Sequence, residues 1–282
     1  MIPQTALDTV RELTEGRRMS IVHLVGGEKG GVGKSVVARL LAQLFIDRGV
    51  RFVALDADGS HGALLRYYSE FAEPVELSEL DGADLIFVRA QEQPNREVLV
   101  DLPAQSHRAL RRWIEENDLL AYAQESGVQL VYWHVTDGGF DSVSHLATLT
   151  EELGDSVRFV IVKNQGRSKD FSQLEASPAF ARVKALGGRV VTLPELDAAV
   201  IYKIDRFGSS FWAAVNASQG EGALAPLERR RAKSWLGRAH QALAEAALPR
   251  ISPAASAPGA ERAAPPGEAP VEQASTNGFG AH

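Results

Sequence analysis

The chain has 282 residues, of which 45% are hydrophobic and 23% charged, with a formal net charge of −6 and no cysteine. This composition suits one large α/β domain with extensions, and the lack of cysteine excludes disulfides and thiolate-held metal sites. The acidic balance is unlike that of a wholly basic nucleic-acid-binding domain. No apolar run is long enough to cross a bilayer, and the polar N-terminus is unlike a secretory signal, so we expect a cytoplasmic protein.

Strand-like and helix-like segments alternate along the chain, which is typical of an α/β fold with a doubly wound, mostly parallel sheet and helices on both faces. The strand-like segments are 20–25, 51–55, 84–88, 98–100, 128–135, 157–163 and 189–193. The helix-like segments are 34–48, 63–72, 105–125, 140–153, a stretch ending near 186, 208–218 and 226–247. We expect one domain over residues 20–250, preceded by an N-terminal extension, 1–19.

The C-terminal segment, 251–282, has a different composition. From Ser252 onward it holds nine Ala, five Pro and four Gly, with almost no large apolar side chain. Such a segment cannot bury enough surface to offset the entropy lost on ordering. We predict a disordered, Ala/Pro-rich tail.

The most informative segment is a glycine-rich loop between the first strand pattern and the first helix pattern, Lys29-Gly30-Gly31-Val32-Gly33-Lys34-Ser35. Strand, glycine-rich loop and helix together form a cradle for phosphates, because backbone N–H groups and the helix N-terminus point at the ligand. We expect Lys34 to reach the β- and γ-phosphates and Ser35 to bind Mg²⁺. An ordinary P-loop has glycine where this chain has Glu28, so the loop is the variant with an additional lysine, Lys29, at its front.

This loop resembles the deviant Walker A loop of the ParA/MinD family of P-loop ATPases. The resemblance implies ATP and Mg²⁺ as ligands and an ATP-sandwich homodimer, in which Lys29 reaches the phosphates bound by the partner. A cation supplied in trans can neutralise charge on the transferring phosphoryl group and couple the nucleotide state to dimerisation. The absence of cysteine excludes the nitrogenase-reductase and iron–sulfur-carrier branches of the family.

Three aspartates follow predicted strands: Asp56, Asp58 and Asp101. Ligands of open α/β sheets bind outside the C-terminal ends of the strands, so these side chains are expected near the phosphate loop. By resemblance to the family's two switches, Asp101 is a Walker B-like residue that holds Mg²⁺ through water, Asp58 orients the attacking water, and Asp56 supports the metal. The alternative is that these aspartates cap helices or form turns and bind no ligand. The family's proline and glutamine after the catalytic aspartate are replaced by Gly59 and Ser60.

Two later segments resemble the parts of the family that contact the base. Asn164 follows the strand pattern 157–163, and Pro194 lies in a loop after the last strand pattern. An amide can pair with the donor and acceptor edge of adenine. The chain has no aspartate two residues beyond Asn164, where GTPases read guanine with a carboxylate, so we favour ATP over GTP.

A basic run opens the last predicted helix, with Arg229, Arg230, Arg231 and Lys233. ParA dimers bind DNA non-specifically through basic residues, and counterion release would make such binding salt-dependent. The alternative is a solvated helix face. The apolar positions that follow fit core packing better than a membrane anchor, so membrane attachment of the MinD kind is not expected.

We therefore predict a slow, partner-stimulated ATPase that dimerises with ATP and positions or segregates DNA or a protein cargo. The segment 135–139 resembles, more faintly, a branch found with conjugative plasmid transfer and mobilisation. Two alternatives stay open: an ATP-dependent metabolic ligase of the related amidotransferase branch, and an ATP-binding scaffold with little turnover. The expected partners are a second copy of the chain, an unidentified stimulating protein and non-specific DNA.

Overall fold

The computed structural model describes residues 20–27, 29–59 and 62–247. The predicted extension, 1–19, and the predicted tail, 251–282, lie outside the described residues, as do Glu28 and Ser60. The division of the chain into extension, domain and tail therefore stays a prediction.

Seven strands of the described chain form one sheet in the order β3-β2-β4-β1-β5-β6-β7, and every paired neighbour is parallel. The strands are β1 (Ile21–Gly26), β2 (Phe52–Asp56), β3 (Ala72–Pro74), β4 (Glu97–Asp101), β5 (Gln129–Thr136), β6 (Val157–Asn164) and β7 (Arg189–Leu193). The central strands read as continuous apolar runs because both faces of the sheet are covered. The predicted α/β fold with a parallel sheet is confirmed.

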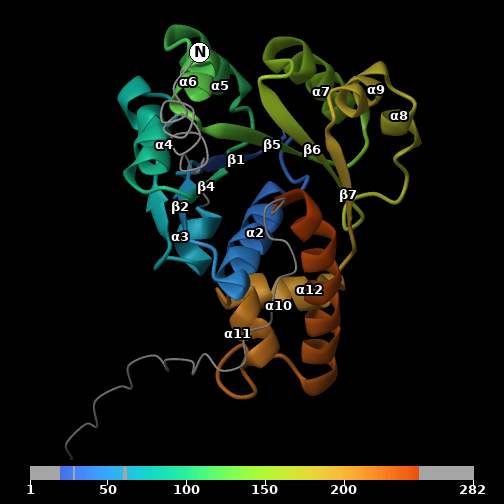
Figure 1. The fold of residues 1–282 in the computed structure, drawn as a ribbon. Coiled ribbons are helices and arrows are strands. Elements are labelled where there is room, and N and C mark those ends of the chain that lie inside the picture. Colours follow the sequence, from blue (N-terminus) through green and yellow to red (C-terminus); the bar gives the residue numbers. More distant parts are fainter. Residues whose placement is uncertain (1–19, 28, 60–61, 248–282) are drawn as a thin grey trace, which may run out of the picture. The chain divides into compact units, whose positions relative to one another are not determined.

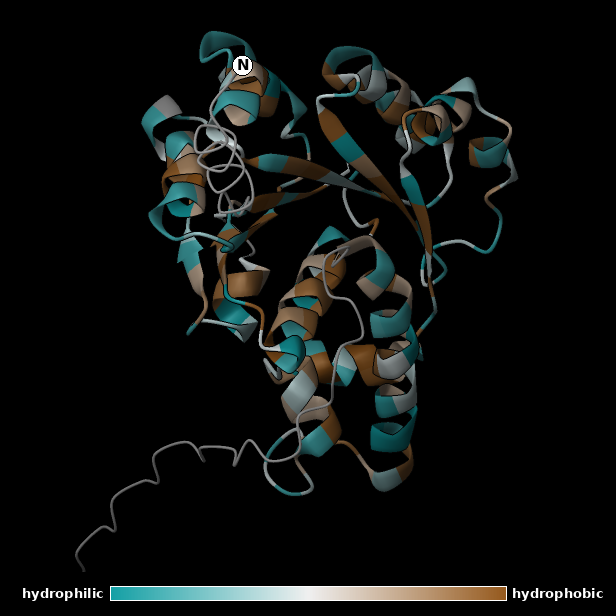
Figure 2. Ribbon diagram, viewed as in Figure 1, coloured by the Kyte–Doolittle hydropathy of each residue, from teal (hydrophilic) through white to brown (hydrophobic). Residues whose placement is uncertain are grey.

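Helices cover both faces of the sheet (Figure 1). One face carries α2 (Lys34–Arg48), α3 (Ala63–Tyr67), α10 (Ala198–Arg206), α11 (Phe211–Asn216) and α12 (Pro226–Ala247). The other carries α4 (Leu80–Glu92), α5 (His107–Glu116), α6 (Leu119–Ser126), α7 (Phe140–Leu153), α8 (Ser172–Glu175) and α9 (Pro178–Ala185). Each face buries its own apolar cluster against the sheet, and Figure 2 shows the hydrophobic strands between the two helix layers.

Two predicted elements are wrong on the β3 side of the sheet. The segment 84–88 is not a strand but the middle of α4, whose buried positions Ala83, Ile86, Phe87 and Ala90 recur at helical spacing. The predicted helix 63–72 ends at Tyr67, and the chain then forms the short edge strand β3. Short apolar runs do not distinguish a strand from a buried helix, which explains the first error.

Two further helices differ from the prediction. The expected helix 105–125 is divided into α5 and α6 by a turn in which Asp118 adopts a left-handed backbone, with φ 45°. Helix α10 was not predicted, although Asp197 caps it by accepting hydrogen bonds from the N–H groups of Ala199 and Val200. A residue of this type directly before an apolar pattern is the usual signal for a helix start.

A chain of side-chain hydrogen bonds crosses the three central strands. The Trp133 indole donates to Nδ1 of His23 at 3.0 Å, and Nε2 of His23 lies 3.1 Å from a Glu97 carboxylate oxygen. Because Nδ1 accepts, the proton of a neutral His23 ring is on Nε2 and is donated to Glu97. This arrangement links β5, β1 and β4 and satisfies a histidine that is fully buried.

Candidate nucleotide-binding site

The glycine-rich loop connects β1 to α2 at the C-terminal edge of the sheet, beside β4 and β5. Its front residues, Lys29 to Gly31, are exposed, whereas Val32 and Lys34 are buried. Gly33 has a φ of 102°, and a Cβ atom there would lie 2.3 Å from the amide nitrogen of Asn164. Only glycine combines this backbone conformation with such a close neighbour. The loop is thus held in a shape that leaves its backbone open to a ligand.

Asp101 lies at the base of the loop and is the strongest candidate for a metal site. Its side chain is buried, and neither carboxylate oxygen has a hydrogen-bond partner of ordinary geometry. Burial raises the pKa of Asp101 to about 7, with repulsion from Asp56 and Asp58 adding to the rise and the Ser35 hydroxyl and Lys34 opposing it. A buried carboxylate beside a hydroxyl is a donor set that suits Mg²⁺. The geometry therefore fits the predicted cation between Ser35 and Asp101.

Asp56 has a different set of contacts. Its carboxylate accepts hydrogen bonds from three backbone N–H groups: Asp58 at 3.1 Å, Leu64 at 2.7 Å and Leu65 at 3.1 Å. Burial raises the pKa of Asp56, and these three donors act against the rise. The side chain thus joins the end of β2 to the start of α3, which is the capping role considered as the alternative. Its support of a metal, and the water-orienting role of the half-buried Asp58, stay predictions.

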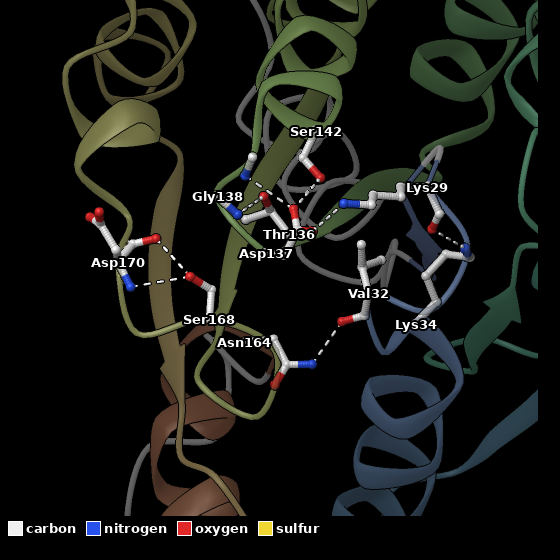
Figure 3. A network of polar contacts seen from close by, with 11 residues as sticks. Lys29, Val32, Lys34, Thr136, Asp137, Gly138, Ser142, Asn164, Ser168 and Asp170 are labelled. Atoms are coloured by element: carbon white, nitrogen blue, oxygen red, sulfur yellow. Dashed lines mark hydrogen bonds and ion pairs between the residues drawn. The ribbon is translucent and has the colours of Figure 1, made fainter.

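The two lysines of the loop are placed differently. Nζ of Lys34 donates to the backbone carbonyl of Lys29 at 3.2 Å, beneath the loop. Nζ of Lys29 extends along the rim to the Oδ2 atom of Asp137 at 2.7 Å, and 47% of the Lys29 side chain is exposed. Figure 3 shows these two contacts on opposite sides of the loop. The hydrogen bond from Lys29 to Asp137 raises the pKa of the lysine.

Asp137 is itself tightly held. Its Oδ1 atom accepts from the Gly139 N–H at 3.1 Å and the Ser142 hydroxyl at 3.2 Å, at the start of α7 (Figure 3). Burial alone would raise the pKa of Asp137, but the hydrogen bonds from Lys29 and Gly139 bring it below its ordinary value. Asp137 was not among the predicted site residues, since nothing in the sequence pairs it with a lysine 108 positions away.

A pocket of about 140 Å³ lies beside the loop and includes both residues predicted to contact a base, Asn164 and Pro194. Asn164 donates to the Val32 carbonyl at 2.7 Å and accepts from the Gly166 N–H at 3.0 Å, so its amide braces the loop (Figure 3). The Trp235 indole donates to the Pro194 carbonyl at 2.7 Å and forms part of the wall.

Several residues that line this pocket were missed, and the larger apolar ones among them are Val36, Ile201 and Trp235. They come from α2, α10 and α12, and the fold alone brings them together. Their apolar spacing reads as ordinary core packing, so the sequence carried no separate signal for them.

The predicted basic surface is only partly available. Arg229 donates to the Ala217 carbonyl at 3.1 Å and is half-buried, so it holds the loop before α12. Arg230, Arg231 and Lys233 are exposed on α12.

Across residues 20–27, 29–59 and 62–247, no helix combines the length and apolar character that a membrane span requires.

Comparison with known proteins places this geometry in a family. The model of the CobQ/CobB/MinD/ParA nucleotide binding domain matches residues 24–200. Protein TraL of Escherichia coli is 27% identical over 191 residues, which cover 63% of this chain and 78% of TraL. Protein MobD of Acidithiobacillus ferrooxidans is 26% identical over 179 residues, which cover 62% of this chain and 78% of MobD.

Solved structures give a weaker likeness. The MinD cell division protein of Aquifex aeolicus has a TM-score of 0.42 and 12% identity over 78% of this chain and 97% of its own. A nucleotide-binding protein of Archaeoglobus fulgidus, solved with ADP, has a TM-score of 0.42 and 17% identity over 76% of this chain and 94% of its own. Since the family model spans more than half of the chain, from β1 through the phosphate loop to α10, the chain belongs to the CobQ/CobB/MinD/ParA nucleotide-binding domain family.

Proposed function

We propose that the protein is an ATPase that acts as an ATP-dependent dimerising switch. One observation carries the proposal: the loop holds two lysines in different positions. Lys34 is buried beneath the loop, where it serves the phosphates bound by its own chain, and Lys29 is exposed at the rim, where a second copy can receive it. Within its own chain, Nζ of Lys29 contacts Asp137 at the rim and not the base of the loop, where Lys34 lies.

The mechanism follows from the residues of the loop and the strand ends. The β- and γ-phosphates of ATP lie against the backbone N–H groups of Gly30 to Ser35, and the Lys34 ammonium offsets their charge. Ser35 and Asp101 would hold Mg²⁺, with Asp56 nearby, and the cation would neutralise charge on the phosphate oxygens. Asp58 orients a water in line with the γ-phosphate.

The second copy completes the site. Lys29 leaves Asp137 and neutralises charge on the phosphoryl group bound by the partner, as an arginine finger does. Loss of the γ-phosphate removes the group that Lys29 contacts in the partner and releases the dimer. Turnover is slow, since a switch requires a long-lived ATP state, and a separate stimulating protein accelerates it.

The pocket beside the loop supports adenine as the base. Asn164, Pro194 and Trp235 lie around it, and no aspartate follows Asn164 at the position that reads guanine. The chain therefore uses ATP rather than GTP.

The cargo that we favour is of the conjugative-transfer or partition kind, in the cytoplasm. The resemblance of segment 135–139 and the matches to proteins named TraL and MobD support a role in conjugative transfer. The exposed residues Arg230, Arg231 and Lys233 support binding to non-specific DNA.

The test is the molecular mass in solution of an Asp58→Ala variant, with and without ATP and Mg²⁺. We expect a monomer without ATP and a trapped dimer with it, because binding is retained and hydrolysis is lost. Lys34→Ala is the control and should bind no nucleotide. A monomeric Asp58→Ala protein with ATP would refute the switch and leave a metabolic enzyme or a scaffold.

Repeating the mass measurement with duplex DNA at two salt concentrations tests whether the ATP dimer binds non-specific DNA. A further rise in mass at low salt, lost in an Arg230→Gln/Arg231→Gln variant, supports DNA. An ATP dimer indifferent to DNA points to a protein cargo.

A further inference from the structure

Helix α5 carries a stripe of charged residues that the nucleotide site does not use. Leu110 and Trp113 face the core, while Arg108, Arg111 and Arg112 lie on the outer side. The outer positions are three and four residues apart, so they share one face of the helix. Three guanidinium groups on one short helix face are a local exception in a chain of net charge −6.

These arginines line a cavity of about 570 Å³ at the C-terminal edge of the sheet. Ser78, from the segment after β3, and Gln105, from the segment after β4, complete its wall together with Ala109 and Glu115. A concave site of this volume accepts a few side chains of a ligand, whereas a DNA duplex is too wide to enter it.

The three guanidinium groups are occupied to different degrees. Arg111 is paired with Glu115 at 2.8 Å and with Glu152 at 3.5 Å. Arg112 donates to the Ser78 carbonyl through one of its five N–H groups. Arg108 makes no ion pair or hydrogen bond with any residue that the structure describes. Arg108 and Arg112 therefore retain donors that can receive carboxylates, each in a two-pronged geometry.

The cavity also borders the segment that follows Asp101. Gln105, four residues beyond that aspartate, has a φ of 59° and so adopts a left-handed backbone that is unusual for its residue type. Such conformations persist only where the surroundings enforce them, and they concentrate at ligand clamps and switches. A ligand in the cavity would contact Gln105, which lies on the segment between Asp101 and α5.

We propose that this cavity is the docking site for an acidic segment of a partner protein. Arg108 and Arg112 are four residues apart on a helix, which corresponds to a rise of about 6 Å. Carboxylates on alternate residues of an extended segment are separated by about 6.6 Å, so a Glu-x-Glu pattern matches the two arginines. Docking at Gln105 would couple the partner to the nucleotide state, and this coupling rests on the proposed switch function, whereas the docking itself does not.

The probe is a fluorescent peptide of four Glu-Gly repeats, titrated with the full chain and followed by anisotropy at low salt. A peptide of four Gln-Gly repeats tests the need for charge. We expect Arg108→Gln/Arg112→Gln to weaken binding of the glutamate peptide at least tenfold. Arg230→Gln/Arg231→Gln removes the same charge from α12 and should change binding less than twofold.

Equal loss in both double variants would overturn the proposal, since it would reduce the interaction to net charge. Equal binding of both peptides would also overturn it. Displacement of the peptide by duplex DNA, together with weaker DNA binding by Arg108→Gln/Arg112→Gln, would assign the cavity to a DNA surface instead.

A second titration with ATP or ADP present tests the coupling. A change in peptide affinity between the two nucleotides implies an equal change in nucleotide preference when the peptide is bound. If the protein stays monomeric with ATP but still binds the peptide through Arg108 and Arg112, the switch proposal fails and the docking site stands.

Discussion

Lys29 and Asp137 form an ion pair of 2.7 Å across the rim of the phosphate loop, and Asp137 is fixed in turn by Gly139 and Ser142. The lysine that a dimer would require is thus held by its own chain. Any state in which Lys29 reaches a partner must first break this contact, once in each copy.

Replacing Asp137 with asparagine should therefore favour the ATP dimer. The amide oxygen can still accept from Gly139 and Ser142, so the start of α7 is kept while the charge is lost. We expect ATP-dependent dimerisation to tighten by about two- to thirtyfold, the range for two exposed ion pairs. The measurement is the dimer dissociation constant from sedimentation.

Asp141→Asn is the matched control, because Asp141 lies in the first turn of the same helix and raises the Lys29 pKa only through its distant charge. It should leave dimerisation nearly unchanged. Weaker dimerisation of the Asp137→Asn protein would instead mean that Asp137 presents the lysine to the partner.

The raised pKa of Asp101 predicts a pH-dependent stability. Because this pKa is about 7 in the folded chain against an ordinary 3.8, the folded state keeps a proton that the unfolded state loses as the pH rises through this window. The metal-free protein should therefore lose stability from pH 4 upward until the pH passes about 7.

Comparison with Asp101→Asn isolates this group, since asparagine does not titrate. We expect the difference in unfolding free energy, variant minus wild type, to increase by about 1 kcal/mol from pH 6 to pH 8. Thermal melts at both pH values provide the check. Parallel pH profiles for the two proteins would count against the raised pKa.

Asn164 links the pocket to the phosphate loop, so its loss should weaken the whole nucleotide. Asn164→Ala leaves the Val32 carbonyl and the Gly166 N–H without their partner, which costs roughly 1–3 kcal/mol where such groups are buried. We expect the dissociation constants of ATP and ADP to rise about tenfold or more, measured by calorimetry. Ser168→Ala, which removes only a local turn contact to Asp170, should bind normally.

His23 should matter for stability rather than for nucleotide binding. His23→Phe leaves the buried Trp133 indole and the Glu97 carboxylate without their shared partner, which we expect to cost about 2–4 kcal/mol of unfolding free energy. Glu97→Gln keeps an acceptor and should cost less than half as much. Urea denaturation distinguishes the two, and an unchanged midpoint for His23→Phe would contradict the assigned hydrogen bonds.

Much of the fold could be predicted from the sequence, because buried parallel strands and the helices between them have distinct periods. The segments that gave β1, β2, β4, β5, β6 and β7 lie within a residue or two of the observed strands. The errors fall where the pattern is short: the apolar positions of α4 read as a strand, and β3 has only three residues.

The candidate site likewise contains residues that the sequence pattern predicts and residues that only tertiary packing brings in. The loop from Lys29 to Ser35 and the position of Asp101 beside it are local or follow from strand order, so sequence reasoning could place them. Asp137 and Trp235 join the site only through tertiary packing, across more than a hundred residues in the first case. Their roles can be assigned only from the atoms that they contact in the folded chain.

Helix α12 has a consequence for how the molecule could transmit information. Its Trp235 forms part of the pocket wall, and the exposed Arg231 lies one turn earlier, on about the same face of the helix. A base that displaced Trp235 would therefore also displace Arg231, so we expect nucleotide binding to change the exposed basic surface of α12. Helix α12 thus directly connects the pocket wall with the exposed residues Arg230, Arg231 and Lys233.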